Sequence, residues 1–450
     1  MTNTADYDSH GCYSYKKIAS VALPLLLSML MEHIIGMTDT AFLGRVSETA
    51  LGASALGTVY FLSFFVLGSG FSFGAQILIA RRNGEKNFAK IGSICRASGL
   101  FLVVLSLIMA AAVKFLSPHI MPKMVQSPEV CQGTIEYLDY RSYGLVFAFI
   151  TAIFRAFYVG IAQTKILTVS SVVMVLSNIF LNYGLIFGKY GMPQMGIAGA
   201  ALASTIAEGA AMLCYIFYTL RFIDLEKYGL KGTLPERGIL KQVFSVSFWM
   251  MIQPFLSVSV WFFFLLAVER LGERPLAVIN LIRSLSALPF IIIHAFSTSA
   301  NSLVSNLIGE NKTPQFWRLV RKIVYSACAI GLPVLIFFAL FPRLSLRLYT
   351  DNMELIASSV NAVYVMCLAS SLQILAFVLF NAMSGTGAIK TTVAIEFVNL
   401  FLYVVFVWLV ILKLRPTPAV AWSAEILYQS TTILLSLLYL TFGKWRQKKL

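Results

Sequence analysis

The sequence predicts an all-α integral membrane protein with twelve transmembrane helices, arranged as two halves of six helices each. The composition, the spacing of long apolar segments and a set of recurring short motifs predict this fold. Of the 450 residues, 58% are hydrophobic and only 12% are charged, and the mean hydropathy is +0.79. Soluble domains carry about 25% charged residues, so this chain has too few charges to cover several soluble domains. The composition therefore excludes a soluble enzyme, a disordered protein and a nucleic-acid scaffold.

Twelve apolar segments are long enough to cross a bilayer, which requires about 20 mostly apolar residues. They are residues 18–42, 50–80, 92–116, 132–160, 166–187, 196–221, 241–268, 276–308, 320–342, 355–385, 391–412 and 418–442. The longest connection is polar and separates the first six spans from the last six. The expected organisation is a tail at 1–17, an N-terminal lobe at 18–221, a linker at 222–240, a C-terminal lobe at 241–442 and a basic tail at 443–450.

The basic residues predict the orientation of these spans. With the N-terminus in the cytoplasm, 22 of the 35 Lys and Arg residues fall on the inner side, 10 on the outer side and three deep within spans. Basic residues collect on the cytoplasmic side of membrane proteins. We therefore expect a multi-pass protein of the cytoplasmic (inner) membrane with both termini inside. The net charge of +15 is explained by this topology and requires no nucleic-acid partner.

Short motifs recur at corresponding places in the two halves. The matches are Gly84-Glu85 with Gly309-Glu310 and Gly160…Lys165 with Gly385…Lys390 (both offset by 225), Leu43-Gly44 with Leu271-Gly272 (offset 228), and Pro24 with Pro254 (offset 230). Because each half has six spans, both halves enter the membrane in the same direction. A pseudo-two-fold axis along the membrane normal then relates them, as in parallel-repeat transporters.

The same motifs resemble a known family. The segment PLLLSMLMEHIIGMTDTAFLGRVSETALGASAL (Pro24 to Leu56), the Gly-Glu loops and the strings RAFYVGIAQTK and NAMSGTGAIKT resemble the MATE (multidrug and toxic compound extrusion) transporters. The string MTDTAFLGR is most similar to their DinF-type branch. The resemblance covers residues 15–442. It implies a MATE/MOP-type fold, rocker-switch alternating access and export driven by an inward proton or sodium gradient, with no cofactor.

Asp39 is the sharpest candidate for ion coupling. An ionisable group inside a membrane is costly and marks function by default. Asp39 lies fifteen residues after Pro24, about four helical turns, on a neighbouring face of the first helix. Proline removes one backbone hydrogen bond and permits a bend, and burial favours the protonated form of a carboxyl group. Proton uptake by Asp39 is thus expected to couple to bending of this helix; the alternative is a solvated side chain near the outer interface.

Polar residues on the fifth and sixth spans are expected to face Asp39. Asn178 and Asn182 are four residues apart and share one helix face, where their amides can donate and accept hydrogen bonds. By resemblance, they and Thr205 correspond to the family's polar cluster beside the first-helix aspartate. Some relatives carry a second carboxylate at the position of Asn182, and its absence here leaves one main titrating group. For either Asn alone, helix–helix packing is an equal alternative.

Further charged residues within the spans are accessory candidates. Glu32 and His33 lie near Asp39 in the first helix and either relay protons, meet a cationic substrate or pair with a neighbouring helix. Glu208, three residues from Thr205, joins its network or points elsewhere. Arg283 is a candidate partner for an anion or for Asp39, whereas Arg155 is expected to reach the interface or helix-end carbonyls.

Sodium-coupled relatives resemble one another in carrying an acidic residue in the middle of the seventh span. The seventh span of this chain lacks such a residue, and its tenth span contains no acid either. This favours proton coupling in the first half, although sodium remains an alternative. The predicted function is multidrug efflux of amphipathic or cationic drugs and toxins by a monomer in the lipid bilayer, with no firmly predicted metal site. The alternatives are a lipid-linked glycan flippase of the same superfold and, from another class, a membrane-embedded enzyme.

Overall fold

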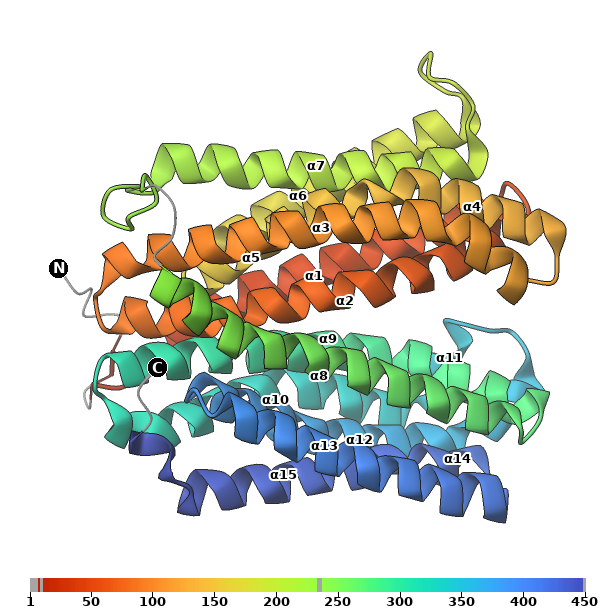
Figure 1. The fold of residues 1–450 in the computed structure, drawn as a ribbon. Helices are drawn as coiled ribbons and strands as arrows, with labels where there is room; N and C mark the ends of the chain where they lie inside the picture. Colours follow the sequence, from red (N-terminus) through yellow and green to blue (C-terminus); the bar gives the residue numbers. More distant parts are fainter. Residues whose placement is uncertain (1–6, 9–10, 233–236, 448–450) are drawn as a thin grey trace. The chain divides into compact units, whose positions relative to one another are not determined.

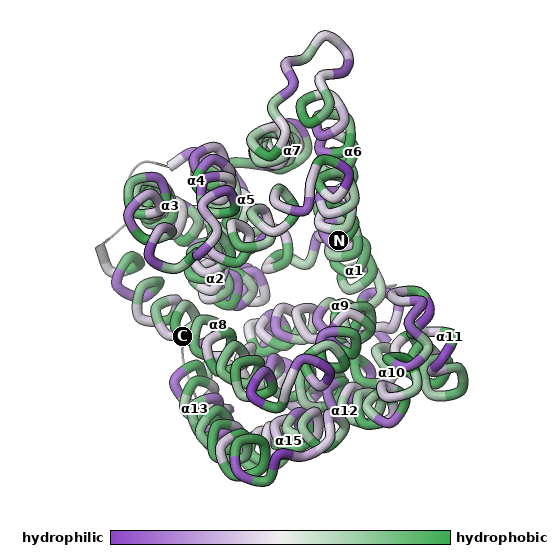
Figure 2. The backbone as a smooth tube through the Cα atoms, turned by 90° about the vertical axis from the view of Figure 1, so that its right-hand side faces the viewer, coloured by the Kyte–Doolittle hydropathy of each residue, from purple (hydrophilic) through white to green (hydrophobic). Residues whose placement is uncertain are grey.

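The computed structural model describes residues 7–8, 11–232 and 237–447. Within these ranges the chain is helical apart from turns, loops and one isolated β-bridge between Tyr7 and Tyr13, which confirms the predicted all-α fold class (Figure 1). Among the described residues, ten helices are long and apolar enough to cross a membrane, or eleven if one bent pair counts as a single span. Hydrophobic residues run along the helices and hydrophilic ones gather at many of the connecting turns (Figure 2). The protein is therefore a multi-pass membrane protein.

The chain divides into two compact units. The first unit comprises Leu27–Ile252, and the second comprises Met1–Leu26 together with Gln253–Leu450. This division differs from the expected lobes at two helices. Residues up to Leu26, at the start of the first helix, belong to the second unit, and residues up to Ile252, at the start of the eighth helix, belong to the first unit. The chain thus crosses between the units twice, each time inside a helix.

The helices of the first unit correspond to the first six predicted spans. They are α1 (Tyr15–Leu43, from Leu27 on), α2 (Glu48–Gly84), α3 (Phe88–Met124), α4 (Pro128–Ser142), α5 (Gly144–Gly160), α6 (Lys165–Phe187), α7 (Gly196–Phe222) and the beginning of α8 (Arg237–Glu269). The predicted fourth span, 132–160, is two helices, α4 and α5, bent by 48°. Arg141 and Glu208 make an ion pair close to this bend, at Gly144.

The second unit contains the remaining helices. They are the rest of α8, α9 (Glu273–Gly309), η2 (Thr313–Gln315), α10 (Phe316–Leu340), α11 (Pro342–Arg347), α12 (Met353–Gly385), α13 (Ile389–Phe406), the π-helix η3 (Val407–Lys413), α14 (Pro418–Trp422), α15 (Ala424–Phe442) and η4 (Lys444–Gln447). The predicted twelfth span is split between α14 and α15. α15 contains the polar run Gln429 to Thr432, which lowers its hydropathy, and it is not among the ten apolar spans.

Glycines allow α2 and α8 to approach closely within the first unit. A Cβ added at Gly74 would lie 2.5 Å from the Cα of Ser247, and one at Gly70 would lie 2.5 Å from the carbonyl oxygen of Met250. The run GSGFSFG has the wrong spacing for a dinucleotide loop and serves helix packing here.

Tyr7, Asp8 and Tyr13 precede α1 and contact other parts of the second unit. The hydroxyls of Tyr7 and Tyr13 both donate to Glu310 Oε1, at 2.9 and 2.5 Å. Lys322 Nζ donates to Asp8 at 2.7 Å and to the carbonyl of Tyr13 at 2.9 Å. Burial, followed by the charge of Glu310, raises the pKa of the Tyr13 hydroxyl, so it stays protonated and remains a donor. These contacts explain why the first residues belong to the second unit.

Candidate functional site

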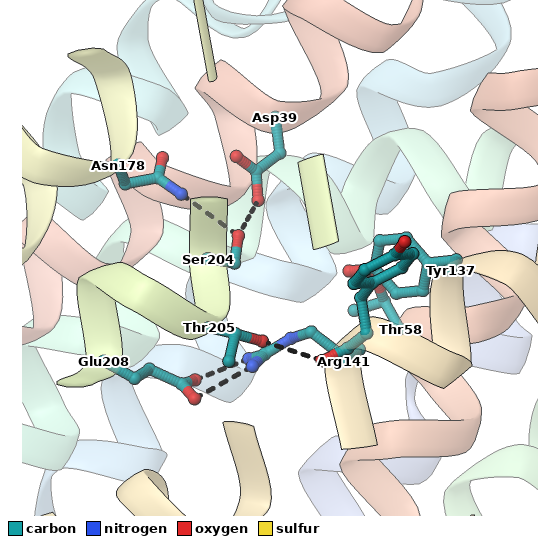
Figure 3. A network of polar contacts seen from close by, with 9 residues as sticks. Asp39, Thr58, Tyr137, Arg141, Asn178, Ser204, Thr205 and Glu208 are labelled. Carbon is teal, nitrogen blue, oxygen red and sulfur yellow. Dashed lines mark hydrogen bonds and ion pairs between the residues drawn. The ribbon is translucent and has the colours of Figure 1, made fainter. Parts of the chain in front are cut away.

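The candidate site lies in the first unit, where α1, α6 and α7 bring four polar side chains together. Asn182 Nδ2 donates to Asp39 Oδ1 at 2.5 Å and to Asn178 Oδ1 at 3.0 Å. Asn178 Nδ2 donates to Ser204 Oγ at 3.0 Å, and Ser204 Oγ donates to Asp39 Oδ2 at 3.2 Å. Figure 3 shows Asp39, Ser204 and Asn178 in this arrangement. The four residues form a closed ring of hydrogen bonds, which we call the Asp39 ring.

The direction of these bonds determines what the ring stabilises. Asn182 and Ser204 both donate to the carboxyl group of Asp39, one to each of its oxygens. An ionised carboxylate accepts only, and hydrogen bonds to a charged group contribute about 1.5–3 kcal/mol each. Asn178 and Asn182 are fully buried, so their amides have few alternative partners. The ring is therefore arranged to hold an ionised Asp39, and protonation of that group weakens it.

The Asn182 side chain has one further property. Its Oδ1 is buried and has no hydrogen-bond partner among the described residues. The oxygen is an acceptor close to Asp39, and a protonated carboxyl group gains the hydrogen that such an acceptor requires.

The described part of the chain contains no group of three or more His, Cys, Asp or Glu side chains that suits a metal ion.

An ion pair lies beside the ring. Arg141 on α4 binds Glu208 on α7 through two hydrogen bonds of 2.8 and 2.5 Å, and its guanidinium lies 3.9 Å from the centre of the Phe61 ring. Gly144 provides the room, because an added Cβ there would meet the guanidinium and would lie 2.7 Å from Glu208 Oε2. Arg141 also interacts electrostatically with Asp39. Glu208 balances the charge of Arg141, and the guanidinium of the pair is the group that acts on Asp39 (Figure 3).

Thr205 does not take the place expected from the resemblance. Its hydroxyl donates to the carbonyl oxygen of Tyr140 at 3.2 Å, whereas its neighbour Ser204 contacts Asp39. Successive residues of an α-helix point about 100° apart, so only one of the two hydroxyls faces α1. Glu208 points to Arg141 rather than to the Thr205 hydroxyl.

Glu32 belongs to a separate polar contact. It pairs with Arg155 on α5 and accepts a hydrogen bond of 3.4 Å from Ser28, which also contacts Ser171 at 2.6 Å. Arg155 therefore neutralises a carboxylate of α1 instead of extending to the interface. His33, the next residue along α1, is exposed.

The remaining predicted residues lie in the second unit. Pro24 is inside α1, two residues before the boundary at Leu26. Arg283 on α9 is exposed, with its guanidinium 5.7 Å from the ring of Trp261.

Two residues of the site were not singled out from the sequence. Ser204 gave no signal beyond its position next to Thr205, because serine is common in transmembrane helices. Arg141 did carry a signal, since an arginine within an apolar span is rarely without a partner or a function.

An apolar hollow of about 370 Å³ lies one turn beyond Asp39. Its lining is mostly aromatic: Phe42, Leu176, Ile179, Phe180, Tyr183 and Tyr190. Most of these side chains are exposed, so the hollow is open, and aromatic ring faces of this kind can hold amphipathic molecules and organic cations.

Comparisons with known proteins agree on one family. The family model MatE matches residues 24–184 and 250–409. A Thermotoga maritima protein described as "Probable multidrug resistance protein NorM" is 26% identical over 443 residues, which cover 96% of this chain and 93% of that protein.

Solved structures show the same fold. A MOP superfamily transporter from Pyrococcus furiosus, whose description refers to a binding pocket of reverse polarity, matches with a TM-score of 0.86 and 19% identity. An outward-facing multidrug resistance MATE transporter of the MOP superfamily matches with a TM-score of 0.85 and 19% identity. Each comparison covers 97% of both chains.

Proposed function

Because this chain belongs to the MatE family and is a membrane transporter rather than an enzyme, we propose that it is a secondary antiporter that exchanges protons for small molecules. The proposed substrates are amphipathic or cationic drugs and toxins. The description of the Thermotoga maritima relative as a multidrug resistance protein and the aromatic hollow near Asp39 both support this substrate class. The gradient supplies the energy, so no cofactor is required. The proposed location is the cytoplasmic membrane, with both termini inside and a functional monomer.

The observation that carries the coupling proposal is the Asp39 ring. With Asp39 ionised, α1 is bonded to α6 through Asn182 and to α7 through Ser204. Protonation removes the charge that strengthens both bonds. A loss of about 2 kcal/mol changes the ratio of two conformations about 30-fold, which is enough to couple proton binding to a conformational change.

Pro24 provides the place where α1 responds. A proline inside a helix removes one backbone hydrogen bond and allows bending. In our proposal, protonation of Asp39 weakens the hydrogen bonds of the ring and lets α1 bend at Pro24. Loss of the proton restores these hydrogen bonds and straightens the helix. This cycle of α1 accompanies the alternation between outward-open and inward-open states.

Transport by reconstituted protein tests the coupling. Proteoliposomes carrying the full chain are given separate pH and sodium gradients, and uptake of a fluorescent organic cation is measured. We expect the pH gradient to drive transport and Asp39→Asn to lower the proton-driven rate at least tenfold, because Asn cannot exchange a proton. Asp351→Asn is the matched control, since Asp351 is exposed at the loop before α12.

Two results would contradict the proposal. Full proton-driven transport by Asp39→Asn would remove Asp39 from the coupling step. Transport driven by sodium with no response to the pH gradient would show that the exchanged ion is not the proton. Unchanged transport by Asp351→Asn is required for the comparison.

A further inference from the structure

The second unit contains two carboxyl groups that the proposed mechanism does not use. Glu396 on α13 is 2% exposed and accepts hydrogen bonds from Ser257 on α8 at 2.5 Å and from Tyr428 on α15 at 2.9 Å to each oxygen. Glu425 on α15 accepts a hydrogen bond of 3.0 Å from Tyr403 on α13. The two tyrosine rings are nearly perpendicular, with centres 6.1 Å apart.

These carboxyl groups have no positive partner. In the part of the chain that the structure describes, no lysine, arginine or histidine from α8, α12, α13 or α15 interacts with either of them. The neighbouring titratable groups are the two tyrosines and the carboxyl groups themselves. A buried carboxylate without a cation costs several kcal/mol, and proton binding is the simplest way to remove that cost. In contrast, Glu32 in the first unit is paired with Arg155.

The internal repeat places a serine where the second unit has Glu396. In the first unit, Ser28 on α1 contacts Ser171 on α6 at 2.6 Å. Glu396 lies 225 positions after Ser171, the same offset that relates the repeated loops. Ser257 lies 229 positions after Ser28. The contact between Ser257 and Glu396 is thus the repeat equivalent of a serine–serine contact. A glutamate replaces a small neutral hydroxyl at this place in the second unit.

Unpartnered acceptors lie beside the acids. Gln429 is 1% exposed and its side chain hydrogen-bonds Glu425, yet its Oε1 has no partner among the described residues. Asn399 lies about one turn from Glu396 on α13, and its buried Oδ1 also has no hydrogen-bond partner among the described residues. A carboxylate offers no hydrogen to an acceptor, whereas a protonated carboxyl group does. The surroundings therefore suit the protonated acids as well as the ionised ones.

We propose that Glu396 and Glu425 form a second proton-binding site in the second unit, in which Tyr428 and Tyr403 connect the two acids. Each carboxylate binds one proton and becomes a neutral acid, with no other bond formed or broken. Glu396 and Tyr403 are about two turns, or roughly 10 Å, apart along α13, so the site extends along the helix axis. A proton is a better fit than a metal ion, because hydroxyl donors already occupy the carboxylate oxygens and the described residues hold no cluster of three ligands.

Infrared difference spectroscopy of the reconstituted full chain measures proton binding directly. Spectra recorded between acidic and alkaline pH contain the C=O band of each acid that titrates. The measurement is made in the Asp39→Asn background, so its result is separate from the role of Asp39 in transport. The exposed carboxyl groups contribute to this band in every variant, so the variants are compared by difference. In the Asp39→Asn background we expect a component that Glu396→Ser reduces and that is lost when Glu425→Gln is added, while the component from the exposed groups stays the same.

Glu396→Ser introduces the residue that the first unit carries at the equivalent position, and Glu396→Gln preserves the size of the side chain. Tyr428→Phe keeps the ring and removes a donor to the carboxylate, so we expect the band to titrate about one to two pH units higher. This variant tests the site even if the glutamate variants fail to fold.

Three results would overturn the inference. They are the loss of this component with Asp39→Asn alone, a spectrum that Glu396→Ser, Glu396→Gln and Glu425→Gln leave unchanged, and a component that sodium removes at constant pH. The last result would identify a sodium site instead of a proton site. A midpoint that Tyr428→Phe leaves unmoved would contradict the connection through the tyrosines.

Discussion

Ser204 and Thr205 are adjacent hydroxyl residues with different partners, and this difference is testable. Ser204 donates to Asp39, so Ser204→Ala removes a bond to the ionised carboxylate. We expect the pH profile of proton-driven transport to move to higher pH by about one unit, because the ionised form loses about 1.5 kcal/mol. Thr205→Ala is the matched control, since its hydroxyl binds the Tyr140 carbonyl. A shift in Thr205→Ala but not in Ser204→Ala would contradict this assignment.

At the scale of residues, the sequence predicted the acid and its amides but not the whole site. The structure brings together Asp39, Asn178 and Asn182. An ionisable group within a span and a pair of amides four residues apart can both be recognised from the sequence alone. The choice between Ser204 and Thr205 depends on the rotation of α7 about its axis, which a uniformly apolar helix does not reveal. The partner of Glu208 likewise depended on which helix face meets α4.

At the scale of helices, the contact between α2 and α8 makes a second prediction. Gly74→Ala would put a methyl group 2.5 Å from the Cα of Ser247, and backbone cannot move away at low cost. We expect the free energy of unfolding to fall by about 1–3 kcal/mol, as for overpacked cores. Thermal unfolding of the purified protein measures the effect.

Gly52→Ala on the same helix is the control for Gly74→Ala. An added Cβ at Gly52 meets nothing within 4 Å, so the better helix propensity of alanine should leave stability equal or slightly higher. Equal melting temperatures for the two variants would show that close packing at Gly74 is not required.

Hydropathy predicted most of the helices well, because a membrane span demands a long apolar run. It did not predict the 48° bend between α4 and α5, which lies where the predicted span passes from a polar helix to a strongly apolar one. It also missed the division of the last span into α14 and α15. The Arg141–Glu208 ion pair lies at the first break, and the apolar length of a segment carries no information about such a contact.

At the scale of the whole molecule, both crossings between the units lie within two residues of a proline. Pro24 precedes the boundary at Leu26 in α1, and Pro254 follows the boundary at Gln253 in α8. Each proline removes a backbone hydrogen bond where the chain changes unit. We predict that Pro24→Ala and Pro254→Ala each lower transport turnover several-fold while leaving thermal stability equal or higher.

Pro333 supplies the control, because it also lies inside a helix, α10, but within the second unit. Pro333→Ala should affect turnover little. Transport assays in proteoliposomes and melting curves on the same samples separate the two effects. An equal loss of turnover in all three variants would assign the effect to proline in general and not to the crossings.

The contacts of the residues before α1 have a consequence for biosynthesis. Tyr13 and Glu310 are 297 positions apart in sequence, and Asp8 and Lys322 are 314 apart. During synthesis the N-terminal segment therefore reaches the membrane long before its binding partners have left the ribosome. Contacts between distant residues form late because their loop must first close. α1 thus acquires these anchoring contacts only after α9 and α10 have been made.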